Sequence, residues 1–529
     1  MKNSIFESNF MKKILILIAA VFSGLASAHT YTNPIIPGFY PDPSICRVDS
    51  DYYLVNSTFQ YFPGIPVWHS RDLVNWEQIG NAIDRPDQID LSGAVSWGGL
   101  YAPTIRYNDG VFYMINTNTS RGGNFFVTAT DPAGPWSDPI WLEQGGIDPS
   151  FYFEDGKCYF TSNPNDGIWL CEIDPVTGKQ LTPSKLIWSG TGGRYPEGPH
   201  IYKKDGWYYL LISEGGTEHA HMITIARSKD IYGPYESNPD NPILTHCNQL
   251  GQLNPIQGTG HADLVEAPDG SWWLVNLAFR PQVGMNHLTG RETYLAPVEW
   301  NEKGWPVVNG NGTIQSVMNV NLPIQGELTP QTDWSLALDF TKQKSFGPDW
   351  VYFRKPIYDN YTFTQKGLVL KGNEWDLNSI KYPTFVGHRQ QHINFEAITS
   401  MTLEAKDKGD QGGITVFMDV RSHYDLYLCK NENGYSVNLD YWLGSIHHNQ
   451  ASIAIPGNSA LLKVESDVNN YKFSYSLDNG ETYKPLGVAD TRYLSSETAG
   501  GFTGIMIGLY CTGKGSPVAF FKNFYYQGK

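Results

Sequence analysis

Five similar stretches of the sequence each begin with a residue that is a candidate for chemistry. They start at Asp42 (DPSICRVDSDYYLVN), Ala102 (APTIRYNDGVFYMIN), Asp148 (DPSFYFEDGKCYFTS), Glu197 (EGPHIYKKDGWYYLLIS) and His261 (HADLVEAPDGSWWLVNL). Three of the five are carboxylic acids, which can serve as general acid and general base when their pKa values are pushed apart. Like charges brought together raise one another's pKa and cost stability, so a convergent set is expected where chemistry uses it.

Asp42 illustrates the alternative reading. It lies in the stretch PDPS, between Pro41 and Pro43. An aspartate beside proline is ordinary turn chemistry, and Pro43 predicts an extended backbone at Asp42. The recurrence of a carboxylate at the same place in three stretches favours a chemical role over a turn.

The repeat predicts the fold that would position these residues. Each stretch contains a short extended run, an Asp-containing turn and an aromatic-rich strand, and the starts are 60, 46, 49 and 64 residues apart. Each unit has room for a four-stranded sheet, which predicts a five-bladed β-propeller. Equivalent positions on the innermost strands would then meet at one mouth of the central axis. A β-sandwich of similar hairpins is the alternative, but it would not need the same motif five times.

The whole chain is predicted to be all-β. Gly and Pro together number 86 of 529 residues, and they punctuate short apolar runs; no long segment keeps an unbroken helical apolar stripe. The propeller pattern fades after Trp300, and residues 319–334 form a connector. Alternating stretches in residues 332–529, such as ITVFMDV and YKFSYSLDNG, predict a two-sheet β-sandwich behind a propeller of residues 29–325.

The N-terminus predicts export. Residues 11–28, MKKILILIAAVFSGLASA, combine two lysines, an apolar run and a small-residue end, which is typical of a secretory signal peptide preceded by an upstream extension of residues 1–10. Cleavage after Ala28 would leave a secreted or periplasmic protein. No later stretch is apolar and long enough to span a membrane, so membrane insertion is not expected.

The net charge and the cysteine spacing limit the classes of partner and of covalent cross-link that the sequence predicts. The formal net charge is −15, and removal of residues 1–28, which carry a net +2, makes it −17. This acidity argues against nucleic acid and other polyanions. An aromatic content of 14% suits a neutral, ring-shaped ligand, although it also builds ordinary β cores. The six cysteines have no C-x-x-C spacing and are interpreted as small core residues, with Cys158 and Cys171 the one pair that could bridge a hairpin.

Four motifs of the chain are YPDPSI, GGIDPSFYFEDGKCYFTSN, RYPEGPHIY and LTGRETYLAPVEW. They resemble glycoside hydrolase family 43, notably its β-xylosidases and α-L-arabinofuranosidases, and the resemblance runs from about Tyr31 to Lys529. It implies a five-bladed propeller with Asp42 as general base, Glu197 as general acid, and Asp148 tuning and orienting that acid. The segments FVGHRQQHINFEA and FFKNFYYQGK resemble the concanavalin-like sandwich found behind many members.

The resemblance also implies a set of substrate-binding residues. Arg291 would bind sugar hydroxyls, Phe59 would stack on the sugar, and His261 would lie beneath the pocket, holding a water or, in some members, a calcium ion. Tyr101 stands where many relatives have Trp, which leaves the contact on the leaving-group side open. A loop near Phe502 resembles the one that caps the pocket in members with this sandwich; the alternative is that Phe502 is a core residue.

The chemistry itself predicts inversion and requires no cofactor. Asp42 and Glu197 would lie on different blades across a ring, which suits the gap of roughly 6.5–9.5 Å that inverting enzymes leave for a water. Both proton transfers belong to carboxylates. His219 and His221 share one face if extended, but without a third ligand a pocket-edge role is favoured over metal binding. No G-x-S-x-G elbow, P-loop or dinucleotide fingerprint competes with this reading.

The predicted function is an exported, inverting exo-glycosidase. The first hypothesis is a β-xylosidase that releases xylose from the non-reducing ends of xylooligosaccharides. The second is an α-L-arabinofuranosidase that removes arabinose side chains from arabinoxylan or arabinan. A non-catalytic propeller lectin is the third, and the retention of all three carboxylates argues against it. The oligomeric state stays unknown at this point.

Overall fold

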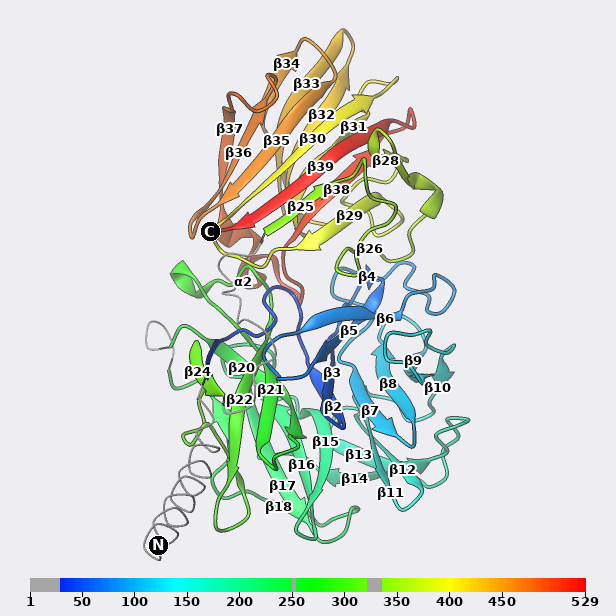
Figure 1. Ribbon diagram of the computed structural model, residues 1–529, viewed down its shortest axis with the longest axis vertical. Coiled ribbons are helices and arrows are strands. Elements are labelled where there is room, and N and C mark those ends of the chain that lie inside the picture. The colour runs from blue at the N-terminus through cyan, green and yellow to red at the C-terminus, as the bar shows by residue number, and fades with distance from the viewer. Residues whose placement is uncertain (1–28, 250–253, 321–334) are drawn as a thin grey trace, which may run out of the picture.

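The protein has two lobes stacked along its longest axis (Figure 1). The computed structural model describes residues 29–249, 254–320 and 335–529. The predicted signal peptide and most of the predicted connector lie outside these residues. Nearly all regular structure is β-strand, as expected from the sequence.

The lower lobe of Figure 1 is a propeller of five antiparallel sheets, each built from one continuous segment of the chain. The first three blades are β2-β3-β5-β6 (Ser44–Val48, Asp51–Val55, Gly64–Ser70, Glu77–Ile83), β7 to β10 (Thr104–Asn108, Val111–Asn118, Gly123–Ala129, Ile140–Trp141) and β11 to β14 (Ile147–Glu154, Lys157–Asn163, Ile168–Ile173, Lys185–Trp188). The fourth is β15 to β18 (Glu197–Lys204, Trp207–Glu214, Met222–Ser228, Glu236–Ser237), with β19 (Leu244–Thr245) on β17. The fifth is β20 to β23 (Gln257–Glu266, Trp272–Phe279, Glu292–Trp300, Pro306–Val308). The five-bladed prediction is confirmed.

The first strands of the blades close a ring around the central axis. β2 contacts β7 and β20, β11 contacts β7 and β15, and β15 contacts β20. A buried polar network ties this ring together: Asp263 accepts hydrogen bonds from Ser44 Oγ (2.6 Å) and Arg106 Nη1 (2.8 Å), and Arg106 Nη2 lies 2.8 Å from His200 Nδ1. A buried polar network of this kind favours one arrangement of the blades. The equivalent ends of the inner strands are therefore held at one mouth.

The upper lobe is a β-sandwich. One sheet has the order β27-β28-β39-β30-β35-β36-β37 with β25 paired to β39, and the other has the order β29-β38-β31-β32-β33-β34. The first comprises Tyr361–Thr364, Gly367–Lys371, Val518–Gly528, Phe395–Glu404, Ser459–Ser466, Asn470–Ser476, Lys484–Asp490 and Ser335–Asp339; the second comprises Thr384–Arg389, Met506–Thr512, Gln411–Asp419, Ser422–Asn431, Gly434–Leu443 and Ile446–Ile455. Alternate residues of β30 are buried, which places one face of that strand on the core.

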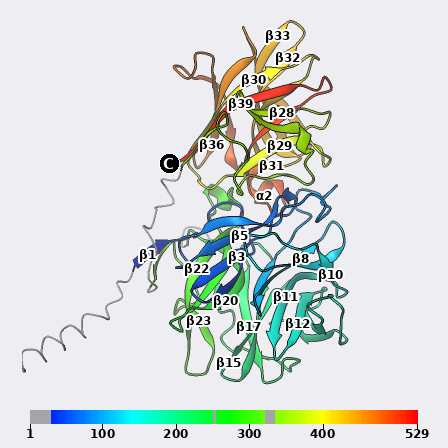
Figure 2. The same cartoon turned by 45° about the vertical axis from the view of Figure 1, so that its right-hand side comes forward.

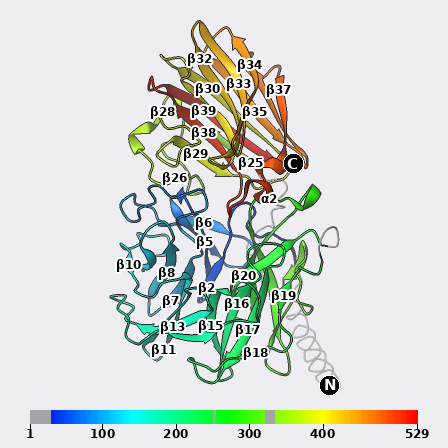
Figure 3. The ribbon, with the colours of Figure 1, turned by 180° about the vertical axis from the view of Figure 1, so that it is seen from behind.

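The sandwich docks directly on the propeller. Strand β26 (Tyr352–Phe353) pairs with β4 (Tyr61–Phe62) of the first blade, and Arg389 donates a 2.8 Å hydrogen bond from Nε to the Phe39 carbonyl. The Arg389 guanidinium also lies 4.3 Å from the Tyr40 ring. In Figures 2 and 3 the short helix α2 (Ser496–Ala499) lies where the two lobes meet. A sandwich loop is thereby brought to the propeller mouth.

The structure also bears on two other predictions, one about a disulfide bridge and one about membrane spans. All six cysteines are free, so the Cys158–Cys171 bridge does not form. In the pairing of β12 with β13, Cys158 lies opposite Ile173, and Cys171 lies opposite Phe160. Among the described residues, no helix combines the length and apolar character needed to cross a bilayer.

Candidate active site

One pocket at the propeller mouth collects all the predicted catalytic and substrate-binding residues, whereas His219 and His221 do not line it. Its volume is about 130 Å³. The lining residues are Asp42, Phe59, Tyr101, Ala102, Ile147, Asp148, Glu197, Thr217, His261, Arg291 and Phe502. Water occupies about 30 Å³ per molecule in the liquid, so the pocket has room for one small ring and little more.

Strained backbone aims several of these side chains. Asp42, Asp148 and His261 have φ angles of 53°, 54° and 42°, in the left-handed region that non-glycine residues rarely adopt. The extended backbone expected at Asp42 is therefore wrong. The pairing register shifts between Gly260 and Ala262, which leaves His261 outside the ladder, and it shifts again directly after Glu197 in β15. Such bulges leave a residue outside the ladder and turn its side chain, here toward the mouth.

The Asp42 carboxyl group is held by donors on both oxygens. Arg291 Nη1 lies 2.7 Å from Oδ1, and Ser57 Oγ donates to Oδ2. Asp42 is only 4% exposed. Charge-assisted hydrogen bonds of this kind are short and directional. Asp42 therefore has one fixed orientation and a positive counter-charge.

Asp148 and Glu197 are the carboxyl groups with shifted acidity. The pKa of Glu197 is raised to about 7, mainly by burial; the charge of His261 lowers it, that of Asp42 raises it and that of Arg291 lowers it. Burial likewise raises the pKa of Asp148 to about 7; the charges of Glu197 and Asp42 add to this, while His261 opposes. The Gly198 N–H donates to Asp148 Oδ2 at 3.1 Å. The two acids thus interact directly through their charges. The site can keep a proton on a carboxyl group near neutral pH.

Arg291 and three aromatic rings form another part of the pocket wall. Arg291 donates to Thr217 Oγ1 (3.1 Å) and to the Phe502 carbonyl (3.2 Å). Its guanidinium carbon lies 5.6 Å from the Phe59 ring and 5.7 Å from the Phe502 ring. The Phe59 ring stacks on Phe502 at 6.3 Å and tilts against Tyr101 at 5.2 Å. Aromatic faces beside hydrogen-bond donors suit the apolar and hydroxyl-bearing sides of a sugar ring.

Phe502 lies in a loop of the sandwich lobe and is not part of the hydrophobic core of that lobe. Its side chain is 38% exposed and lines the pocket. Gly500 and Gly501, with φ of 83° and 82°, make the turn before it. The loop is anchored by Glu497, whose carboxylate accepts hydrogen bonds from the His287 backbone N–H (3.0 Å) and lies 2.6 Å from His287 Nδ1. The alternative that Phe502 is a core residue does not hold.

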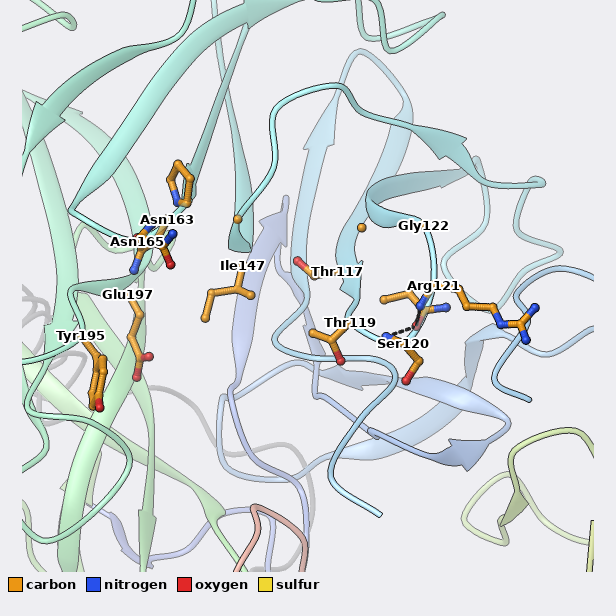
Figure 4. A pocket seen from close by; sticks show the side chains of 14 residues that line it. Thr117, Thr119, Ser120, Arg121, Gly122, Ile147, Asn163, Asn165, Tyr195 and Glu197 are labelled. Carbon is orange, nitrogen blue, oxygen red and sulfur yellow. Dashed lines mark hydrogen bonds between the residues drawn. The ribbon is translucent and has the colours of Figure 1, made fainter. Parts of the chain in front are cut away.

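A second, larger pocket adjoins the first and was missed by the sequence analysis (Figure 4). Its volume is about 600 Å³. The lining consists of residues 117–123 and 163–165 with Gly146, Ile147, Tyr195 and Glu197. In Figure 4 Glu197 and Tyr195 face Thr119 and Ser120 across the opening. Glu197 and Ile147 line both pockets, so Glu197 lies at their junction. The turns that line this pocket belong to separate blades. The one signal of them in the sequence is that they are rich in Gly and Asn.

Comparison with known proteins decides the family. The model of "Glycosyl hydrolases family 43" matches residues 31–306, and that of the "Beta xylosidase C-terminal Concanavalin A-like domain" matches residues 337–527. The chain belongs to glycosyl hydrolase family 43. It is therefore a glycoside hydrolase, and the lectin hypothesis is set aside.

Individual relatives of this family 43 enzyme cover nearly its whole length. It is 41% identical to a non-reducing end α-L-arabinofuranosidase of Bacteroides ovatus, over 96% of each chain. It is 40% identical to a xylosidase/arabinosidase of Butyrivibrio fibrisolvens, over 91% of this chain and 96% of that protein. Among solved structures, the Bacteroides ovatus xyloglucan PUL GH43B superposes with a TM-score of 0.90 at 40% identity, covering 95% of this chain and 100% of that one.

In the described parts of this family 43 enzyme, the side chains around His261 do not form a calcium site on their own. Calcium takes six to eight oxygen ligands, whereas His261 offers a nitrogen whose nearest carboxylate oxygen, Asp148 Oδ2, lies 3.9 Å away. Within the described ranges, no three His, Cys, Asp or Glu side chains form a metal-binding group. His219 and His221 also diverge: His219 Nε2 lies 4.0 Å from Glu497, and His221 Nε2 lies 3.3 Å from Glu197.

Proposed function

We propose that this enzyme is an inverting exo-glycosidase that releases xylose from the non-reducing ends of xylooligosaccharides. One observation carries the proposal: a pocket sized for a single ring holds three carboxyl groups and meets a larger pocket at Glu197. The small pocket suits the terminal sugar, and the large one suits the leaving group. Phe502 closes the small pocket on the sandwich side, as an enzyme that accepts only chain ends requires.

A second candidate is an α-L-arabinofuranosidase that removes arabinose side chains from arabinoxylan or arabinan. It is favoured by the names of two similar relatives, which are an arabinofuranosidase and a xylosidase/arabinosidase. Both sugars are pentoses with similar hydroxyl arrays, so one pocket of this size suits either. Tyr101, which lines the pocket, is the residue to examine for the choice.

Asp42 is proposed as the general base. It would take a proton from a water molecule as that water attacks the anomeric carbon from the face opposite the leaving group. The fixed orientation of its carboxyl group by Arg291 and Ser57 suits this task. Preorganised hydrogen bonds cost little reorganisation during the reaction.

Glu197 is proposed as the general acid. It would give its proton to the glycosidic oxygen while the bond from that oxygen to the anomeric carbon breaks, so that the leaving sugar departs as a neutral alcohol. The raised pKa keeps this proton available near neutral pH. Asp148 would support the protonated form through like-charge repulsion.

The remaining residue roles and the localisation are proposals of the same kind. Arg291, Phe59 and Phe502 would bind the terminal sugar, and His261 would hold a water beneath it. No step is assigned to calcium. Export to the periplasm or medium, after cleavage behind Ala28, is supported by the N-terminal sequence alone.

Two measurements test this function. Turnover of nitrophenyl β-xyloside should exceed that of nitrophenyl α-L-arabinofuranoside; a tenfold preference for the second establishes the alternative. Proton NMR of the first-released sugar should show the inverted anomer. Retention of configuration would remove Asp42 from the role of base.

A further inference from the structure

Glu197 has a buried neighbour that the roles above do not use. His221 lies in the turn before β17, is fully buried, and places Nε2 3.3 Å from Glu197 Oε1. Neither of its ring nitrogens has a hydrogen-bond partner of good geometry in the described parts of the chain, although the backbone of Gly258 lies near enough to favour a proton on the ring. Burying a polar ring that has so few hydrogen-bond partners lowers stability. Such a cost at an active site calls for a function.

The backbone is shaped to admit this imidazole. A Cβ atom added to Gly260 would lie 2.0 Å from His221 Nδ1 and 2.1 Å from Cε1, so the ring lies flat against the glycine. Gly260 directly precedes His261, where the ladder of β20 is interrupted. Only glycine permits an approach this close. The same break in the β20 ladder that turns the His261 side chain toward the pocket therefore also leaves room for the His221 ring.

The imidazole stays uncharged while it touches the acid. Burial lowers the pKa of His221 to about 3, and the nearby Arg291 adds to this, while Asp42 opposes. His261 and Arg291 already lower the pKa of Glu197, whereas the carboxylate of Asp42 raises it. Asp148 is the other acid that interacts with Glu197. A positive charge on the imidazole beside Oε1 would favour loss of the proton from Glu197. A neutral polar ring can touch the carboxyl group without that effect.

We propose that His221 is a positioning residue for Glu197, holding its carboxyl group at the junction of the two pockets in the orientation that delivers the proton to the leaving oxygen. This rests on the proposed role of Glu197 as general acid. Misplacement of a catalytic group by about 1 Å can cost 10²-fold in rate. The loss should fall on substrates whose leaving groups need protonation.

The test compares His221→Leu with His221→Gln on two substrates that share the preferred pentose. One carries a dinitrophenyl leaving group, which departs without protonation, and the other is the disaccharide. For His221→Leu, kcat on the disaccharide should fall about 10–100-fold, with less than about threefold loss on the dinitrophenyl glycoside and little change in KM. His221→Gln, which keeps a polar side chain, should recover most of the loss. In a Glu197→Gln background, His221→Leu should have no further effect.

Two other variants distinguish the positioning role of His221 from a general loss of stability. Gly260→Ala leaves His221 in the chain but displaces its ring, and should reproduce the selective loss. His246→Leu removes another fully buried histidine, one that bonds Ile256 and Ile314 away from both pockets, and should lower stability without changing leaving-group dependence. Equal losses on both substrates, or a further loss in the Glu197→Gln background, would overturn the proposal. If Glu197→Gln itself shows no leaving-group dependence, the proposed function fails first.

Discussion

Arg291 Nη1 lies 2.7 Å from Asp42 Oδ1, although 249 residues separate them in the chain. The same guanidinium donates to the Phe502 carbonyl of the sandwich lobe. One side chain thus joins the first blade, the fifth blade and the second lobe at the pocket. The predictions below follow from this arrangement.

Asp42→Asn and Glu197→Gln should each lower kcat by at least 10²–10⁴-fold, because proton-transfer catalysis commonly contributes that much. Both replacements preserve shape, so circular dichroism should be unchanged. Glu197→Gln should regain activity on glycosides with good leaving groups, whereas Asp42→Asn should not. Equal loss on all substrates would remove Glu197 from the role of acid.

Arg291→Lys should lower kcat/KM by about 10²-fold, because a lysine ammonium cannot reproduce the planar fork that bonds Asp42, Thr217 and Phe502 together. The matched control is Arg280→Lys. Arg280 pairs with buried Glu292 at 2.7 Å and does not line the pocket. The control should lower the melting temperature and spare KM; comparable kinetic losses in both would contradict a specific role for Arg291.

Phe502→Ala should raise KM for the terminal sugar with little change in melting temperature, because this side chain is 38% exposed and walls the pocket. Phe524→Ala, in the fully buried sandwich core, should instead cost about 3–5 kcal/mol of stability. Steady-state kinetics and thermal melts of the two variants give the comparison. A large drop in melting temperature with unchanged KM for Phe502→Ala would contradict the capping role.

The raised pKa of the Asp148–Glu197 pair predicts how activity and stability depend on pH. Asp148→Asn removes the like charge that supports the protonated acid, so the alkaline limit of kcat/KM should move from near pH 7 to lower pH. An upward movement of that limit would contradict the tuning role.

The same pair should destabilise the fold at high pH. Acids whose folded pKa is raised above the unfolded value stabilise the native state at low pH, and this contribution is lost as pH rises from about 4 through 7. Glu197→Gln should therefore gain about 1–3 kcal/mol over the native protein at pH 8 and nothing at pH 4. Chemical unfolding at both pH values measures the difference; an equal gain at pH 4 would point to another cause.

Chelation by EDTA should leave most of the activity in place, because the described residues around His261 do not form a calcium site. The measurement is turnover before and after dialysis against EDTA, with magnesium and calcium added back separately. Complete loss that calcium alone restores would make the ion part of the mechanism.

The sequence by itself determined the propeller and the three carboxylates. Both follow from local patterns: a hairpin motif recurs five times, and its first residue is acidic in three of them. Repeats report architecture because equivalent positions in successive blades must occupy equivalent places in space. The residues that a family resemblance supplied, including Phe502, also proved to line the pocket.

Only the tertiary structure decided how those residues are aimed and what surrounds them. The left-handed backbone at Asp42 contradicts its proline neighbours, since contacts from other blades and the Arg291 pair outweigh local preference. The second pocket is built from turns of different blades, and His221 meets Glu197 because Gly260, far along the chain, leaves room for its ring. These relationships join residues distant in sequence, so no local pattern records them.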